Sequence, residues 1–184
     1  MKTDTKEFLT WDDYRATPSE WPYYELIEGE LVQSVSPGTR HQEILGNVMM
    51  PLREFVRANR LGTVVHGPLG VFLSPHNVLH PDLLFVSQAR REILVEEGVH
   101  GPPDLVVEII IPATTERDRT WKRPIYARCG ATELWLIESE LEQIHRYDLA
   151  TDAATPVQIV KNDEVLETAV LPGLVIAAKD VFQT

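Results

Sequence analysis

The sequence has few of the residues that mark several common protein classes. It contains a single cysteine, Cys129, which excludes an internal disulfide and a zinc site built from several cysteines. No apolar run approaches the roughly 18 to 20 residues that a membrane span needs. Residues 1–4 lack the charged-then-apolar layout of a signal peptide. These absences predict a cytoplasmic protein that does not enter a membrane.

Signatures of several enzyme classes are also missing. The six histidines have neither HExxH nor any comparable zinc-binding spacing. There is no glycine-rich phosphate loop and no Gly-x-Ser-x-Gly nucleophile elbow. His76 and His80 are four residues apart, but prolines flank them, so we predict surface positions for both. No helix-turn-helix or zinc finger is visible, so the sequence predicts no preference for a particular nucleic-acid sequence.

Positive charge is scarce and uneven. The net charge of −11 argues against a protein that coats nucleic acid without sequence preference, because contacts to phosphates need a positive surface. Residues 130–184 hold 10 acidic and 3 basic residues, whereas residues 1–129 hold 18 and 14. A local basic rim and a set of solvated helix faces are both compatible with the two basic clusters. The clusters are Arg53, Arg57 and Arg60, and Arg117, Arg119, Lys122, Arg123 and Arg128.

The length of 184 residues suits a single domain spanning residues 1–184. Alternating apolar patterns predict an α/β fold, with a sheet of mixed strand direction, flanking helices and extra hairpins near both termini. Helices are expected at 7–20, 40–60, 88–95 and 115–129. Strands are expected at 23–27, 30–35, within 62–73, and at 82–86, 105–111, 132–137, 143–149, 157–160 and 165–170.

Local signals add detail to these elements. Thr39 and Gln42 have the spacing of a capping box at the start of the 40–60 helix. Pro51 predicts a kink in that helix, because an interior proline removes a hydrogen bond. Pro124 predicts a bend in the 115–129 helix, or a later start near residue 120. Residues 75–79 are expected to form a turn, and the strands 157–160 and 165–170 to pair as a hairpin.

Two carboxylates stand in apolar strands, where a charged group is costly unless something pairs with it. Glu108 lies inside the run Leu-Val-Val-Glu-Ile-Ile-Ile, which is expected to be a central strand covered on both faces. Asp82 begins another apolar strand, directly after Pro81. A metal ion or a basic side chain would supply the missing partner. Backbone N–H groups or arginines could also hold two strand-end carboxylates, and that alternative stays open at this point.

Carboxylates that converge from neighbouring strands would suit a hard cation. Mg²⁺ is typically held by one or two carboxylates together with water and phosphate oxygens. Such an ion polarises a phosphodiester and lowers the pKa of a bound water. A nearby lysine would add positive charge for the transition state. Asp82 and Glu108 are therefore the candidate metal ligands.

These residues resemble the PD-(D/E)XK motif of the restriction-endonuclease-like superfamily. Pro81-Asp82 followed by Glu108 in an apolar strand carries the resemblance. Within the superfamily, the chain resembles the Uma-two family of bacterial endonucleases over nearly its whole length. The similar segments are 24–31, 40–42, 80–86, 101–110, 118–128, 133–137 and 171–174. The resemblance implies a restriction-endonuclease-like mixed sheet flanked by helices.

The resemblance also implies roles for individual residues. Asp82 and Glu108 match the metal-binding carboxylates. The usual lysine would fall at position 110, where this chain has Ile110, and the family assigns its role to a lysine on the following helix, matched by Lys122. Further catalytic candidates are Tyr126, which lies on the helix face of Lys122 and could orient it, Glu25, a recurrent acid near the N-terminus, and His41, at the start of the long helix.

The function implied is cleavage of DNA by a Mg²⁺-dependent endonuclease, in which Mn²⁺ can substitute. A homodimer would let such an enzyme cut both strands. One segment departs from the family pattern: Ile111-Pro112-Ala113-Thr114 stands where two small hydroxyl residues are usual. Because that turn leads into the helix with Lys122, an inactive nuclease-fold protein that binds or serves as a structural partner is the alternative.

Overall fold

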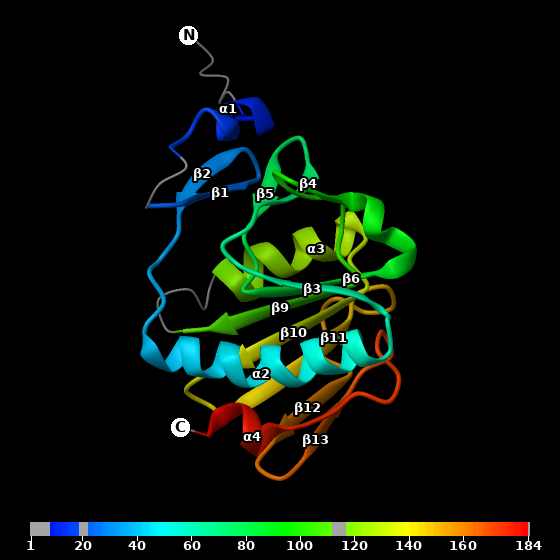
Figure 1. The fold of residues 1–184 in the computed structure, drawn as a ribbon. Helices are drawn as coiled ribbons and strands as arrows, with labels where there is room; N and C mark the ends of the chain where they lie inside the picture. Colours follow the sequence, from blue (N-terminus) through cyan, green and yellow to red (C-terminus); the bar gives the residue numbers. More distant parts are fainter. Residues whose placement is uncertain (1–7, 19–21, 112–116, 184) are drawn as a thin grey trace, which may run out of the picture.

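The computed structural model describes residues 8–18, 22–111 and 117–183, and Figure 1 shows their arrangement. The helices are α1 (Trp11–Arg15), α2 (Thr39–Ala58), the 3₁₀ helix η1 (Gln88–Ile93), the π-helix η2 (Arg117–Lys122), α3 (Arg123–Cys129) and α4 (Ala178–Phe182). The strands are β1 (Tyr24–Ile27), β2 (Glu30–Gln33), β3 (Gly62–His66), β4 (Val71–Ser74), β5 (Asn77–Leu79), β6 (Leu83–Ser87), β7 (Leu94–Val95), β8 (Gly98–His100), β9 (Leu105–Ile110), β10 (Glu133–Glu138), β11 (Gln143–Asp148), β12 (Gln158–Lys161), β13 (Val165–Glu167) and β14 (Val175–Ala177).

The strands form two larger sheets and one small one. The main sheet has the order β12-β11-β10-β9-β6-β3, and its β9–β10 pair is parallel while its other pairs are antiparallel. The second sheet has the order β2-β1-β5-β4-β8-β7, and β13 pairs with β14 alone. The fold is therefore the predicted α/β arrangement with a mixed sheet.

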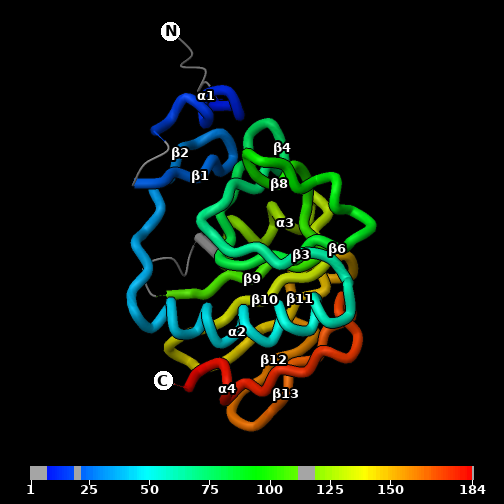
Figure 2. Tube along the Cα trace, viewed as in Figure 1, coloured from blue at the N-terminus to red at the C-terminus, as the bar shows by residue number. Residues whose placement is uncertain are grey.

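Helices cover both faces of the main sheet (Figures 1 and 2). On one face, α2 packs its apolar stripe of Ile44, Val48, Leu52 and Val56 against alternate residues of β9 and β10, and α4 joins the same core. On the other face, α3 packs through Ile125 and Tyr126, and residues of the second sheet complete that core. Alternation along a strand sends successive side chains to these two different cores.

The strand β9 lies at the centre of this arrangement, between β10 and β6. All six of its residues are buried, as the apolar sequence run predicts. Leu105, Val107 and Ile109 face the α2 side. Val106 and Ile110 face the α3 side, and Glu108 shares their position in the alternation. The carboxylate of Glu108 therefore leaves the sheet toward α3.

Several helix predictions need correction. The helix expected at 7–20 is a single short helix, α1, that ends at Arg15 within the described residues. The predicted Thr39 capping box is wrong, because Gly38 occupies the N-cap without a side-chain hydrogen bond. The helix α2, by contrast, runs through Pro51 to Ala58, as the helix prediction for 40–60 requires. Burial of one complete apolar stripe outweighs the backbone hydrogen bond that this proline cannot make.

The helix expected at 115–129 is divided into two types. Its first part, η2, is a π-helix, and α3 begins at Arg123 with Pro124 in its first turn. A proline is tolerated there because the first N–H groups of a helix have no partner within it. Residues 112–116, including most of the altered turn, lie outside the described residues.

Two strand predictions are wrong. The strands β12 and β13 do not pair with each other, because β12 extends the main sheet beside β11 and β13 pairs with β14. The turn expected at 75–79 is shorter, because Asn77–Leu79 form β5 and pair with β4 and β1. By contrast, the strands expected at 23–27 and 30–35 do form and pair, and the turn between them lies at Glu28 and Gly29. Both have positive φ (51° and 76°), the combination that a tight hairpin requires.

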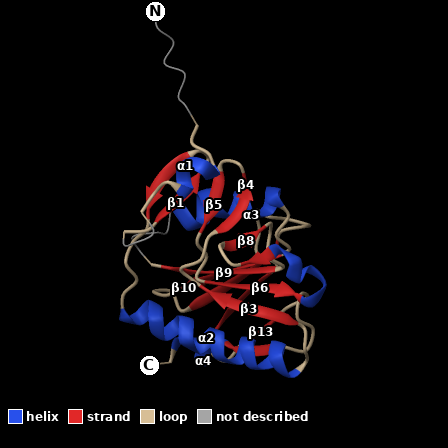
Figure 3. Cartoon of the chain, turned by 45° about the horizontal axis from the view of Figure 1, so that its top comes forward, coloured by secondary structure: helices blue, strands red, loops and turns tan. Residues whose placement is uncertain are grey.

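The view in Figure 3 separates the two sheets and shows α2 lying along the main one. Among the residues that the structure describes, none of the helices has the length and apolar character required to cross a bilayer.

Candidate active site

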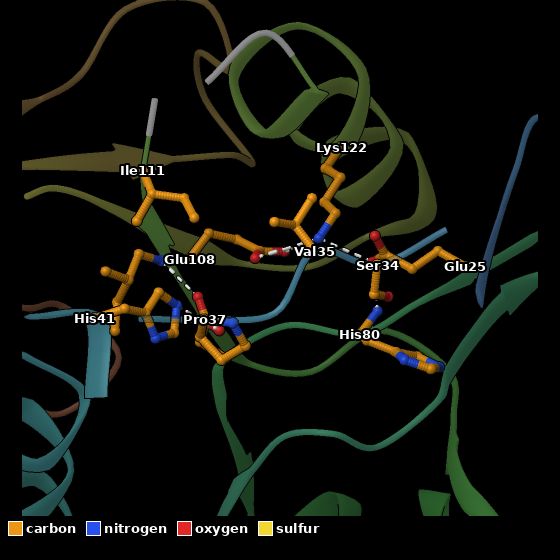
Figure 4. A pocket seen from close by; sticks show the side chains of 11 residues that line it. Glu25, Ser34, Val35, Pro37, His41, His80, Glu108, Ile111 and Lys122 are labelled. Atoms are coloured by element: carbon orange, nitrogen blue, oxygen red, sulfur yellow. Dashed lines mark hydrogen bonds and ion pairs between the residues drawn. The ribbon is translucent and has the colours of Figure 1, made fainter. Parts of the chain in front are cut away.

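A small cavity of about 80 Å³ opens where α2 begins, β9 ends and η2 passes into α3 (Figure 4). Five of the six residues predicted for the site line this cavity. They come from five separate segments: β1, the first turn of α2, the residue before β6, β9 and the end of η2. The lining residues are Glu25, Ser34, Val35, Pro37, His41, His80, Asp82, Glu108, Ile109, Ile111 and Lys122.

The carboxylate of Glu108 is buried and receives hydrogen bonds from two side chains of the neighbouring helical segment. The hydroxyl of Tyr126 donates to Oε1 over 2.7 Å. The ammonium of Lys122 lies 3.2 Å from Oε1 and 3.3 Å from Oε2. These contacts explain how the core strand tolerates a charge, because a buried carboxylate with donors loses much less than an unpaired one.

Lys122 also binds Glu25. Its Nζ lies 2.8 Å from Oε1 of Glu25, and the two side chains are only 3% and 2% exposed. The backbone N–H of His80 donates to the same oxygen over 2.8 Å. Lys122 therefore bridges a carboxylate of the second sheet and one of the main sheet, and Figure 4 shows its side chain reaching between them.

Asp82 stands opposite Glu108. The register pairs Leu83 with Val107 in antiparallel strands. Asp82, which precedes Leu83, therefore faces Glu108, which follows Val107. Facing residues of antiparallel strands have Cβ atoms about 4.5 to 5.5 Å apart. The N–H of Ile109 donates to Oδ2 of Asp82 over 2.7 Å, and Nε2 of His41 lies 3.0 Å from Oδ1. The strand carrying Glu108 thereby also fixes the direction of Asp82.

The donor chemistry of this cavity fits a divalent cation. Glu25, Asp82 and Glu108 carry three formal negative charges and Lys122 one positive charge, which leaves −2. Asp82 is 23% exposed, and its two hydrogen bonds use only part of the roughly four lone-pair sites of a carboxylate. No group of three His, Cys, Asp or Glu side chains forms a ready-made metal cage in the described ranges. The arrangement instead suits Mg²⁺, which keeps several waters and needs only one or two carboxylates.

Two groups beside Glu25 have shifted pKa values. Burial lowers the pKa of His80; the Glu25 charge opposes this shift and the Lys122 charge adds to it. Burial, with the negative charge of Glu25, raises the pKa of Tyr14 to about 12. The Tyr14 hydroxyl and Nε2 of His80 are 2.7 Å apart, so α1 is linked to the cavity through this pair. Both groups are neutral near pH 7.

The predicted surface position of His80 is therefore wrong. The residue is partly buried and lines the cavity, whereas His76 is exposed as predicted. The flanking prolines do mark a loop, but α1 covers it, and that contact joins residues 66 positions apart. Its place directly before Pro81-Asp82 is the only sequence signal that could have indicated a position in the site.

The basic side chains around Lys122 that the structure describes do not form a free positive rim. Arg119 binds Glu138, Arg128 binds Glu28, and the guanidinium of Arg123 lies 5.0 Å from the centre of the Tyr147 ring. Each of these side chains therefore binds a carboxylate or packs against an aromatic ring.

A mixed sheet between helices, with facing carboxylates at the ends of two strands and a lysine beside one of them, defines the restriction-endonuclease-like class of folds. Residues 11–179 match the model of the Uma2 family, described as "Putative restriction endonuclease", and the chain belongs to this family. A search of curated proteins gave no match.

A solved structure supports the same fold. The chain is similar to a protein described as "a putative nuclease belonging to DUF820 from Anabaena variabilis ATCC 29413", with a TM-score of 0.80 at 19% identity. The match covers 95% of this chain and 97% of that one. At this identity the similarity establishes the fold alone.

Proposed function

We propose that the protein is a Mg²⁺-dependent endonuclease that hydrolyses phosphodiester bonds in DNA. One observation carries the proposal: Asp82, directly before β6, stands opposite Glu108 of the adjacent strand β9, and the Lys122 ammonium lies against Glu108. Membership of a family described as restriction endonucleases supports DNA as the substrate. Restriction-endonuclease-like proteins generally use divalent metals, and the oxygen-only donor set favours Mg²⁺, with Mn²⁺ as a substitute.

In the proposed reaction, a water oxygen bonds to phosphorus while one phosphorus–ester oxygen bond breaks. The departing ester oxygen takes up a proton and leaves as a hydroxyl group. Asp82 and Glu108 would hold the metal ion, which supplies Lewis acidity for the phosphate and lowers the pKa of water when it is bound.

The remaining residues of the site have assigned tasks in this proposal. Lys122 places a positive charge beside the phosphate oxygens, on which negative charge develops in the transition state. Tyr126 holds the carboxylate of Glu108, and His41 holds that of Asp82. Glu25 positions the Lys122 ammonium at the cavity.

Plasmid cleavage with purified variants tests the proposal. We expect the wild-type protein to nick plasmid in Mg²⁺ or Mn²⁺ and to lose this activity in EDTA. Asp82→Asn should lower the rate by about 10³ or more, because a metal contributes several kcal/mol of charge stabilisation and 1.36 kcal/mol corresponds to tenfold. Asp163→Asn changes an exposed aspartate of the same charge and should retain the activity. Equal cleavage by the wild type and Asp82→Asn would refute the proposal.

An inactive nuclease-fold protein is the second candidate, and one observation favours it. The Lys122 ammonium already contacts two carboxylates, so a phosphate would have to compete with them. Calorimetry separates the candidates, because the nuclease should take up Mg²⁺ or Mn²⁺ and lose this uptake on Asp82→Asn. A protein that binds neither ion, even with DNA present, would support the second candidate.

A homodimer remains part of the proposal, since two sites would allow both strands to be cut. Sedimentation of the protein with and without a DNA duplex tests this prediction directly.

A further inference from the structure

A second hollow lies at the far end of α2 from the candidate active site. It measures about 350 Å³ and lies between the last turns of the helix and the first residues of β3. Arginines of α2 and of the turn that follows dominate its lining. The lining residues are Arg53, Val56, Arg57, Arg60, Gly62, Thr63, Val64 and Gln88.

The three arginines of this hollow are exposed, and none of their side chains has a hydrogen-bond or ion-pair partner in the part of the chain that the structure describes. In this they differ from the basic residues near the cavity, such as Arg119 and Arg128, which bind carboxylates. Three unpaired guanidinium groups beside one hollow create a local positive field on a protein whose net charge is −11. Planar guanidinium groups suit phosphate oxygens in particular.

The arginine hollow and the active site lie along one seam. The helix α2 turns back into β3, which is the edge strand of the main sheet, and the two elements are in contact. At the start of the helix, Gln42 and Leu45 line a further hollow of about 260 Å³ with Gly67 and Pro68, which follow β3. That hollow includes Asp82 and so adjoins the cavity of the candidate active site. Figure 1 shows α2 running along the main sheet, from near the end of β9 to the turn that leads into β3.

The length of α2 sets the separation. Between His41 and the residues Arg53 and Arg57 the helix rises about 18 to 24 Å, at 1.5 Å per residue. Along one strand of B-form DNA, where phosphates follow one another about every 3.4 Å, this span corresponds to roughly five to seven phosphates. Half a turn carries that strand to the opposite side of a straight duplex, so a duplex with its scissile phosphate at Asp82 would place a phosphate of its complementary strand at the arginines.

We propose that Arg53, Arg57 and Arg60 form a phosphate-binding site that holds the DNA backbone about half a helical turn away from the scissile bond. The inference rests on the proposed nuclease function for its choice of ligand. The net charge of −11 repels DNA as a whole, so the unpaired arginines would also select which face the duplex approaches.

The test measures DNA binding separately from cleavage. Anisotropy of a fluorescently labelled duplex of two helical turns is recorded in EDTA between 50 and 200 mM salt, with wild-type protein and with the triple variant R53Q/R57Q/R60Q. Each lost phosphate contact reduces the slope of log K against log salt by about 0.9. For three contacts, the wild-type affinity should fall about 40-fold more than that of the variant over this range.

Single variants provide a matched control. R57Q should reduce the slope by about 0.9, whereas K161Q removes an exposed charge from β12, at the opposite edge of the main sheet, and should leave the slope unchanged. Plasmid cleavage in Mg²⁺ is followed in parallel, so the two proposals are judged by different readouts. A lower slope for the triple variant supports the phosphate site whether or not the plasmid is cut.

Three results would overturn the inference. The first is an unchanged salt slope in the triple variant, even where the wild type cuts plasmid. The second is a wild-type protein that does not bind the duplex at 50 mM salt. The third is a triple variant that keeps its DNA binding but changes its sedimentation, which would identify the hollow as a contact between copies of the chain.

Discussion

The two ends of α2 treat charge in opposite ways. At its first turn, His41 meets Asp82 beside the buried triad of Glu25, Lys122 and Glu108. At its last turns and in the turn that follows, three arginines stand exposed, without hydrogen-bond or ion-pair partners among the described residues. Burying a charge carries a large desolvation cost that only close partners offset, whereas an exposed charge remains hydrated. The first end therefore holds its charges in a fixed geometry, whereas the second leaves its charges hydrated.

Replacing Lys122 should lower the unfolding free energy far more than replacing an arginine at the other end of α2. Lys122→Met leaves two buried glutamates without their shared cation, and a broken buried pair typically costs about 3 to 5 kcal/mol of unfolding free energy. Denaturant unfolding without metal measures this loss. Added Mg²⁺ should restore part of it in the variant, because a ligand that binds only the folded state stabilises that state.

Arg57→Met is the matched control at the other end of the helix. Its guanidinium is exposed and unpaired, so the unfolding free energy should change by less than about 0.5 kcal/mol. Equal stability losses for the two variants would contradict the contrast between the ends. A Lys122→Met protein as stable as the wild type would show that the glutamates do not need the ammonium.

A smaller effect is expected from His41, which acts through Asp82. His41→Ala should weaken Mg²⁺ binding and cleavage by about 10- to 100-fold, the usual range for a residue that orients a metal ligand. His41→Gln retains a side-chain donor and should recover part of this loss. Calorimetric Mg²⁺ affinity is the deciding measurement, since a purely structural role would lower stability and leave the affinity of the folded protein unchanged.

The smallest effect concerns Tyr14, at the edge of the buried network. Its pKa of about 12 exceeds the ordinary 10.0, so the folded state retains the hydroxyl proton longer than the unfolded state does. The resulting stability is complete below pH 10 and is lost as the pH rises toward 12. Two pKa units set an upper limit of about 2.7 kcal/mol, and partial exposure of the hydroxyl reduces it.

The Tyr14→Phe variant isolates this contribution. Ultraviolet titration of tyrosinate, taken as the difference between wild type and variant, should show one group ionising near pH 12. A difference curve centred on pH 10 would contradict the burial of this hydroxyl beside Glu25.

The residues that converge on the cavity were easier to predict from the sequence than the connections around them. Glu108 and Asp82 were recognisable because the first interrupts an apolar strand and the second stands at the start of one, where a charged group needs partners. Lys122 was found only by resemblance, since nothing in a helical pattern distinguishes a lysine that turns inward from one in solvent. Glu25 binds this lysine because the second sheet packs against α3. No local sequence pattern encodes that contact.

The fold shows the same division between local and long-range information. The helix α2 and the strand β9 are long and strongly patterned, and their existence and burial follow from periodicity. The three-residue strand Asn77–Leu79 is too short for a periodic signal and forms because β4 and β1 pair with it. The strand β12 pairs with β11 instead of β13, a choice between partners that hydrophobic alternation leaves open.

The order of the site residues along the chain affects how the protein is made. The ribosome synthesises Glu25, His41, Asp82 and Glu108 before Lys122. The strand β10, which pairs with β9, is synthesised later still. A growing chain, or one shortened by a stop codon before position 122, thus carries the carboxylates without the ammonium that two of them bind. The cavity can therefore be completed only after Lys122 and β10 have been synthesised.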